Sequence, residues 1–124
     1  MEKKLKITVI TVVYNGIDYI EDTILSVINQ DYSNIEYIII DGKSDDGTMD
    51  IVEKYATKIS YWVSESDNGI YDAMNKGIKV ATGDWIIFMN CGDYFFSSDI
   101  ITQVFSQMLI GIDVVYGGAW VRSM

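Results

Sequence analysis

Short β-branched runs that end in polar residues are the feature that most constrains this chain. The strongest run covers residues 35–41 and leads through Ile38, Ile39 and Ile40 into Asp41, which is followed by an acidic turn over residues 42–48. Such a run is typical of a buried parallel strand, and open α/β sheets bind ligands outside the carboxyl ends of their strands. This position makes Asp41 a candidate site residue.

Two further strand-like runs end in the same way. Residues 7–13 lead into Tyr14 and Asn15, and the run that starts at residue 85 leads into a turn that begins with Asn90 and ends with Asp93. The carboxyl ends of parallel strands meet at one edge of a sheet, where such sheets bind their ligands. The three polar strand ends therefore predict one cleft.

Segments with helical spacing separate the strand-like runs. We expect strands over residues 6–14, 35–41, 59–64, 85–90 and 113–116, and helices over residues 17–30, 47–57, 70–81 and from a cap at 97–99 to about residue 109. This alternation predicts βαβ units, an α/β fold with a mainly parallel sheet, and one domain over residues 1–124. We expect Thr82, Gly83 and Asp84 to end the third helix as a C-cap. Because the β-forming stretch 114–121 lies so close to the end of the sequence, we expect a domain cut after its fifth strand, with a frayed edge strand as the alternative.

Composition limits the partners of the chain. It has 18 acidic and 9 basic residues, a net charge of −9, which argues against nucleic acid or an anionic membrane as the binding partner. An anionic ligand would then call for a metal ion. The single cysteine, Cys91, excludes an internal disulfide, and no run approaches the roughly 20 apolar residues of a membrane helix. These features favour a cytoplasmic protein.

Acidic and basic side chains near the strand ends suggest specific chemistry. Asp41 can cap a helix or bind a ligand; since residues 44–46 are better placed to cap, its carboxylate is expected to be free to accept from a base imino group or a ribose hydroxyl. Asp93 stands where Mg²⁺ or Mn²⁺ could meet phosphate oxygens, although a Gly-Asp pair also forms simple turns. Lys76, beyond a polar turn at residues 67–69, can neutralise a diphosphate or be a solvated surface charge.

Five motifs in this order closely resemble the family 2 glycosyltransferases. They are the stretches at residues 11–15, 26–30, 41–48, 67–77 and 88–93, and together they span nearly the whole chain. The resemblance implies a GT-A-like, Rossmann-type three-layer sandwich. It also implies an inverting transfer of a sugar from a nucleotide diphosphate sugar, UDP-sugar first, to a hydroxyl of a glycan or lipid-linked acceptor in polysaccharide synthesis. Mg²⁺ or Mn²⁺ would be the cofactor, and peripheral association with the inner face of the membrane stays open.

The same resemblance assigns roles to individual residues. Thr11 and Tyr14 would line the base pocket, Asp41 would accept from a uracil-like ring, and Asp93 would hold the metal. The remaining expected donor contacts are Asn15, Asn68, Lys76 and Asn90.

This chain also departs from the family pattern. Asn90 and Gly92 stand where the metal motif usually has acids, so the ligand is Asn90, Gly92 or Asp93, and Met74 replaces a frequent Arg. The catalytic base is expected beyond residue 124.

Two other functions are compatible with parts of the pattern. A phospho-receiver signalling module would use Asp41 as phosphoacceptor, but Tyr14 and Asn15 stand where such a module needs an acidic pair. A non-catalytic nucleotide-sugar binding module would explain the missing acids at Asn90 and Gly92.

Overall fold

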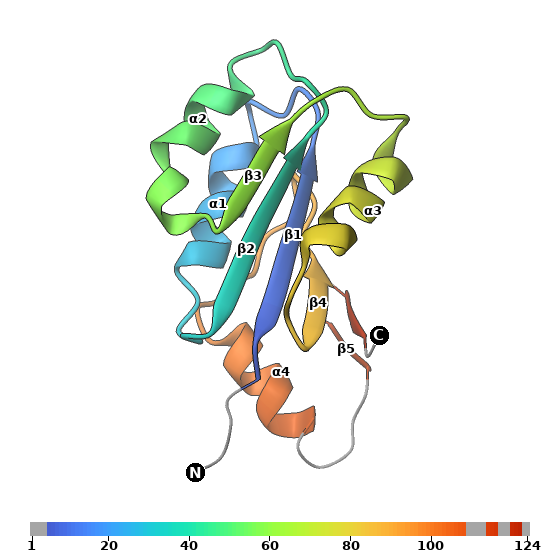
Figure 1. Ribbon diagram of the computed structural model, residues 1–124. Helices are drawn as coiled ribbons and strands as arrows, with labels where there is room; N and C mark the ends of the chain where they lie inside the picture. Colours follow the sequence, from blue (N-terminus) through green and yellow to red (C-terminus); the bar gives the residue numbers. More distant parts are fainter. Residues whose placement is uncertain (1–4, 109–113, 117–119, 123–124) are drawn as a thin grey trace.

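A six-stranded sheet lies between two layers of helices in the computed structural model, which describes residues 5–108, 114–116 and 120–122 (Figure 1). The strands are β1 (Ile7–Val13), β2 (Ile35–Asp41), β3 (Tyr61–Ser64), β4 (Trp85–Phe88), β5 (Val114–Tyr116) and β6 (Trp120–Arg122). The helices are α1 (Ile20–Ile28), α2 (Thr48–Lys54), the 3₁₀ turn η1 (Ala56–Lys58), α3 (Ile70–Val80) and α4 (Ile100–Met108). The strand order is β3-β2-β1-β4-β6-β5.

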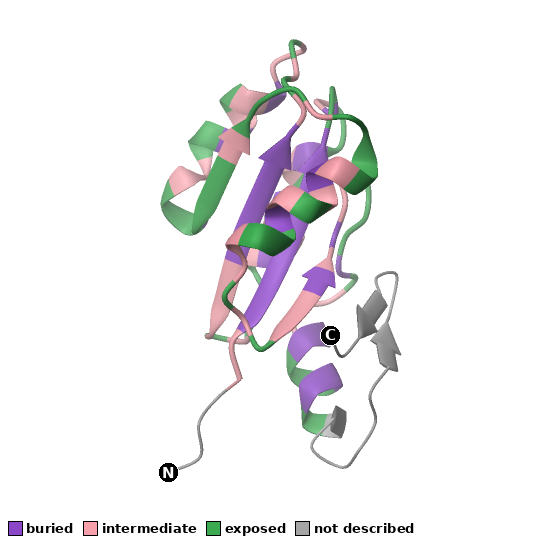
Figure 2. Cartoon of the chain, turned by 45° about the vertical axis from the view of Figure 1, so that its right-hand side comes forward, coloured by how far each residue is buried: buried purple, intermediate pink, exposed green. Residues whose placement is uncertain are grey.

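The four strands β3, β2, β1 and β4 are parallel, with β1 at the centre. In β1, Ile7 pairs with Ile35 of β2 on one side and with Trp85 of β4 on the other. All seven residues of β1 are buried, which suits a strand composed entirely of the β-branched residues Ile, Val and Thr (Figure 2). The carboxyl ends of these strands consequently share one edge of the sheet.

Alternating residues of the central strands build two hydrophobic cores. Ile7, Val9 and Val13 pack on the face covered by α1, α2 and α4, and Ile10 and Val12 pack on the face covered by α3. The two helical layers on opposite faces are visible in Figure 1. The predicted three-layer α/β fold is thereby confirmed.

The predicted elements are confirmed in order, with corrections at their ends. The first helix begins at Ile20 because residues 17–19 form a turn, and the expected helix over 47–57 divides into α2 and η1. The last strands differ more from the expected parallel arrangement. Strand β6 pairs antiparallel with β4, and β5 pairs antiparallel with β6. Leu109 and Asp113, the expected end of one helix and start of one strand, lie outside the described residues. Within the described part, no helix is long and apolar enough to cross a bilayer.

Gly83 allows the chain to pass close to Thr8 of β1 and is not the predicted helix cap. Helix α3 ends at Val80, and its C-cap residue Ala81 has extended backbone angles. A Cβ at Gly83 would lie 2.4 Å from Thr8 Oγ1 and 2.7 Å from Thr8 N, so a side chain there would collide with β1. The glycine is needed because the chain passes directly against the start of the central strand.

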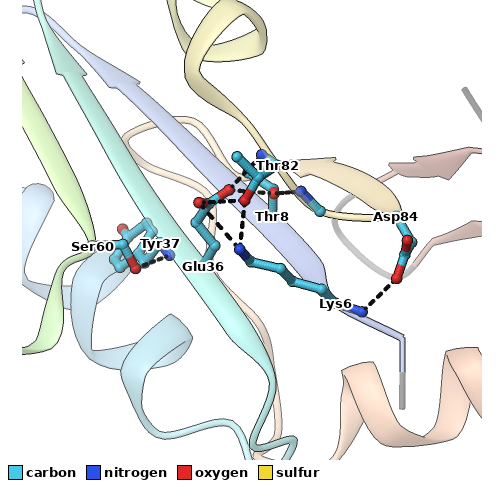
Figure 3. Close-up of polar contacts among 8 residues, drawn as sticks. Lys6, Thr8, Glu36, Tyr37, Ser60, Thr82 and Asp84 are labelled. Carbon is cyan, nitrogen blue, oxygen red and sulfur yellow. Dashed lines mark hydrogen bonds and ion pairs between the residues drawn. The ribbon is translucent and has the colours of Figure 1, made fainter. Parts of the chain in front are cut away.

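Glu36 ties this same turn to the amino-terminal end of the sheet (Figure 3). Its carboxylate accepts hydrogen bonds from Thr8 Oγ1 (2.8 Å), the backbone N–H of Thr82 (2.8 Å) and Thr82 Oγ1 (2.8 Å), and Lys6 Nζ lies 3.6 Å away. Burial raises the pKa of the Glu36 carboxyl, but the bonds from Thr82 and Thr8 and the charge of Lys6 outweigh it, so the pKa lies below its ordinary value of 4.5. The ionised carboxylate therefore stabilises the folded state.

We expect Glu36→Gln to lower the free energy of unfolding by about 1 kcal/mol at neutral pH, because it removes charge-assisted hydrogen bonds. A carboxyl whose pKa is lowered by folding stabilises the protein above its unfolded pKa and loses this effect as pH falls through the folded pKa. The difference between wild type and variant should therefore shrink below pH 4.5. Urea unfolding across this pH range measures it. The exposed Glu53, changed to Gln, is the matched control and should show no such difference.

Candidate functional site

A cavity lined by described residues opens at the carboxyl end of β1. Its volume is about 490 Å³, and it lies where the chain order reverses, since β1 has β2 on one side and β4 on the other. Open α/β sheets bind ligands at such switch points. The lining residues come from the ends of β1 and β4 and the start of α3: Val12, Val13, Tyr14, Asn15, Gly16, Tyr19, Asp67, Gly69, Ile70, Ala73, Asn90 and Cys91.

Two loops are fastened together beside this cavity. The backbone N–H of Asn15 donates to Ser44 Oγ (2.7 Å), and Asn15 Oδ1 accepts from the backbone N–H of Asp45 (2.9 Å). The backbone N–H of Gly16 donates to Thr48 Oγ1 (3.0 Å). Asn15 has a φ of 50°, a left-handed conformation that asparagine tolerates better than most residues. Asn15 therefore lines the cavity and also holds the loop after β1 to the loop after β2.

Asp41 is buried at the end of β2, contrary to the expectation that its carboxylate is free. Its Oδ1 accepts from Ser44 Oγ (2.5 Å), and its Oδ2 accepts from the backbone N–H of Ser44 (2.8 Å) and from Ser64 Oγ (2.7 Å). The residue has no exposed surface and is not among those that line the cavity. In this structure Asp41 joins β2, β3 and the following loop.

Thr11 is likewise buried and does not line the cavity. Its hydroxyl donates to the carbonyl of Met89 (2.6 Å), so the phenol of Tyr37 must supply the proton of the 2.8 Å bond between Thr11 and Tyr37. Burial raises the pKa of Tyr37 above its ordinary value, which keeps this donor protonated. The next two residues of β1, Val12 and Val13, do line the cavity.

The aromatic and polar side chains that line the cavity include Tyr14, Asn90 and Asp67. The Tyr14 ring is 66% exposed and offers a flat surface. Asn90 Oδ1 is buried without a hydrogen-bond partner in the described part of the chain. Asp67 was absent from the expected contacts, although it follows β3 much as Asn15 follows β1, and this positional rule could have found it. It is the only charged side chain among the described lining residues.

Lys76 and Asn68 lie beside the cavity but do not line it. Lys76 Nζ donates to the carbonyl of Ser66 (3.0 Å) and pairs with Glu65 (3.2 Å) and Asp72 (3.9 Å). The backbone N–H of Asn68 donates to Asp72 Oδ2 (3.0 Å). The charge of Lys76 is thus already compensated, and the residue fixes the loop that carries Asp67.

Asp93 is exposed in a second, smaller cavity of about 270 Å³, next to Gly92, Tyr94 and Phe96. Its backbone N–H donates to the carbonyl of Asn90 (2.9 Å), which closes a turn, and Gly92 has the positive φ of 101° that the turn requires. Thr23 of α1 holds the turn by donating to the carbonyl of Asp93 (2.7 Å). The turn therefore presents the Asp93 carboxylate three residues after Asn90.

The oxygens of Asn90 and Asp93 are of the kind that binds a divalent cation shared with a phosphate ligand, and the two residues line neighbouring stretches of two different cavities. Mg²⁺ and Mn²⁺ prefer oxygen ligands and need only one or two carboxylates when phosphate and water complete the coordination. Within the described residues, no three acidic, His or Cys side chains are arranged to hold a metal on their own. The buried, unpartnered amide oxygen of Asn90 is the observation that supports such an ion here.

Cys91 lines the cavity with a thiol that is held protonated. Burial, followed by the charges of Asp46 and Asp93, raises the pKa of Cys91 to about 11. Its Sγ would lie 2.4 Å from a Cβ at Gly16, so the glycine makes room for it. The thiol is therefore a space-filling group and not a nucleophile at neutral pH.

The family model described as glycosyl transferase family 2 matches residues 8–124. The chain belongs to this family. The resemblance drawn from the sequence is thus confirmed, and a signalling receiver is not supported.

Curated relatives of this glycosyltransferase chain come from several bacteria. An uncharacterised glycosyltransferase of Mycobacterium tuberculosis is 40% identical over 98 residues, which cover 78% of this chain and 37% of the relative. A glycosyltransferase of Bacillus subtilis named for teichuronic acid biosynthesis is 39% identical over 90 residues, covering 70% and 36%. The chain spans well under half the length of these relatives.

Solved glycosyltransferases share the fold. Residues 1–349 of Staphylococcus aureus TarS in complex with UDP-GlcNAc have a TM-score of 0.75 at 27% identity, over 86% of this chain and 31% of that one. A mannosyltransferase from Pyrobaculum calidifontis in complex with GDP-Man and Mn²⁺ has a TM-score of 0.74 at 25% identity, over 80% and 31%. These neighbours confirm the GT-A-like fold class.

We expect Asp41→Asn to lower the free energy of unfolding by about 1–3 kcal/mol. The amide keeps only one of the two acceptor oxygens that bind Ser44 and Ser64. Urea unfolding measures the change. The matched control is Asp45→Asn in the same loop, whose exposed side chain should contribute little. Equal stability of the two variants would contradict the joining role of Asp41.

We expect Cys91 to react slowly with iodoacetamide at pH 8. A thiol whose pKa is raised from 9.0 to about 11 carries about a hundredfold less thiolate at that pH. Because the chain has one cysteine, intact mass spectrometry reports this site alone. Unfolding in urea should restore the ordinary rate, and equal rates in the folded and unfolded states would show that the thiol is not shielded.

Proposed function

We propose that this chain is the donor-binding part of an enzyme that transfers a sugar from a nucleotide diphosphate sugar to an acceptor hydroxyl, with inversion at the anomeric carbon. The cavity at the end of β1 is the observation that carries the proposal. It lies at the switch point of a sheet whose solved neighbours bind UDP-GlcNAc and GDP-Man. A UDP-sugar is the first candidate donor, and a glycan or lipid-linked molecule is the acceptor class.

The cavity supplies separate groups for the parts of such a donor. The exposed ring of Tyr14 offers a stacking surface for a nucleobase, and aromatic stacking of a base is worth roughly 1–3 kcal/mol. The amide oxygen of Asn90 lies at the end of β4, with Asp93 on the adjoining turn. The base would therefore lie over β1, and the diphosphate would lie toward the turn at residues 90–93.

Charge compensation favours a divalent cation at this turn. No basic side chain is among the described residues that line the cavity, and Lys76 is already paired. Asn90 and Asp93 would hold Mg²⁺ or Mn²⁺, which would stabilise the negative charge of the departing nucleoside diphosphate. The chain's own residues would orient the donor: the cavity walls exclude water from the base, and the bonds of Asn15 to the neighbouring loop keep Tyr14 in place.

We expect UDP or GDP, and the matching UDP-GlcNAc or GDP-Man, to bind in the presence of Mn²⁺ and to bind at least tenfold more weakly without it. Isothermal titration calorimetry measures both. Asp93→Asn should remove most of the dependence on Mn²⁺, while Asp50→Asn, an exposed change on α2, should leave it intact. Absence of binding by either nucleotide under both conditions would contradict the proposed function.

A further inference from the structure

We propose that Thr23 and Ser26 of α1 are positioning residues for Asp93, because they fasten the backbone of the turn that carries it and the residues directly after that turn. The inference rests on the proposed function, in which Asp93 holds a divalent cation at the diphosphate. It gives a role to the helical motif at residues 26–30, none of which lines the cavity at the end of β1.

The single hydroxyl of Thr23 holds two backbone groups of this turn. Thr23 Oγ1 accepts from the N–H of Gly92 (3.1 Å) and donates to the carbonyl of Asp93 (2.7 Å), which is closer to it than the carbonyl of Tyr19 (3.3 Å). The peptide between Gly92 and Asp93 is held from within the turn, since the N–H of Asp93 donates to the carbonyl of Asn90 (2.9 Å). Three successive peptide units around Asp93 therefore each make a hydrogen bond, and Thr23 supplies two of these bonds.

The turn needs this support because Gly92 is its most flexible point. Gly92 has a φ of 101°, and no described atom lies within 4 Å of the position that a Cβ would take there. Both Gly92 and Asp93 are exposed, so packing restrains them little. The peptides on either side of a Cα atom set the direction of its side chain. Holding these peptides therefore fixes the direction in which the Cα–Cβ bond of Asp93 leaves the turn.

Ser26 and Gln30 continue the attachment along α1 and just past its end. Ser26 lies one turn after Thr23, on the same face of the helix. Its Oγ accepts from the N–H of Phe95 (3.1 Å), and Gln30 Nε2 donates to the carbonyl of Ser97 (2.7 Å). The backbone that follows the turn is thereby fastened to the same helix.

A metal ligand that is held in advance binds a cation more tightly than one that must be ordered first. Loss of a group that orients a metal ligand typically costs about 10–100-fold in metal affinity. Helix α1 can supply such support because Ile20, Ile24 and Val27 anchor it in the core. No cluster of three metal-binding side chains exists in the described part of the chain to compensate for a displaced Asp93.

A purely structural role for Thr23 would lower stability without changing the dependence of binding on a metal. Thr8 offers a matched comparison, since its hydroxyl accepts from the N–H of Gly83 (2.9 Å) and donates to Glu36 (2.8 Å) at the opposite end of the sheet. Thr8 and Thr23 are both almost fully buried. Substitution by Val removes the hydroxyl and keeps the shape at either position, so the two variants lose comparable hydrogen bonds in different places.

The test compares wild type with Thr23→Val, Thr23→Ser, Ser26→Ala and Thr8→Val. Isothermal titration calorimetry with UDP and with GDP is run in Mn²⁺ and in EDTA, and electron paramagnetic resonance counts the Mn²⁺ bound in the presence of nucleotide. We expect Thr23→Val to weaken binding in Mn²⁺ roughly tenfold and to leave binding in EDTA unchanged. Ser26→Ala should show a smaller loss in the same direction. Thr23→Ser, which keeps a hydroxyl, and Thr8→Val should match wild type.

Amide hydrogen exchange of Gly92, followed by NMR without metal or nucleotide, checks the bond to Thr23 directly. Gly92 is exposed, so its N–H should exchange slowly only because Thr23 Oγ1 accepts it. Exchange should be faster in Thr23→Val and unchanged in Thr8→Val. Urea unfolding shows which variants are folded, and Ser26→Ala decides the question if Thr23→Val is not.

An unchanged dependence on Mn²⁺ in folded Thr23→Val, or an equal loss in Thr8→Val, would overturn the inference. Equal weakening in Mn²⁺ and in EDTA would show that α1 supports donor binding in general and not through Asp93. Rapid exchange of Gly92 in wild type would remove the bond on which the inference depends. If wild type binds neither nucleotide, the proposed function fails as well, whereas Mn²⁺-dependent binding that the variants leave intact removes the inference alone.

Discussion

The buried carboxylate of Asp41 is the interaction on which the ligand-binding edge of this protein depends. It accepts hydrogen bonds from Ser64 at the end of β3 and from Ser44 in the loop after β2, and Ser44 in turn accepts the N–H of Asn15 after β1. One acidic group thus connects three strand ends. Because charge-assisted bonds are strong where water is excluded, the rim is ordered before a ligand arrives. A preordered rim reduces the entropy cost of binding.

This arrangement separates carboxylates that shape the site from those that can meet a ligand. Asp41 is committed to the protein, while Asp67 lines the cavity at the end of β1 and Asp93 is exposed in the second, smaller cavity. In the proposed function, Asp93 would face the diphosphate. An acidic site would hold an anionic donor in this way because the negative groups near the phosphates would act through a cation.

The sequence predicted the layers and the edge of the sheet that carries the site, because apolar β-branched runs and the polar residues that end them are local signals. Asn15 and Asn90 were found by this rule and line the cavity. Thr11 and Lys76 show its limit. The burial of Thr11 depends on its partners Tyr37 in β2 and Met89 after β4, and the pairing of Lys76 with Glu65 depends on where the loop before α3 folds back. Neither is encoded by spacing along the chain.

The sequence alone determined the α/β fold, the order of its elements and the family, since each depends on short-range patterns that survive without knowledge of contacts. Only the tertiary structure decided that β6 runs antiparallel beside β4 and that Asp41 is buried while Asp67 reaches the cavity. The physical reason is that the availability of a carboxylate depends on which donors surround it. For Asp41, one of those donors is Ser64, which is distant in sequence and arrives only when β3 pairs with β2.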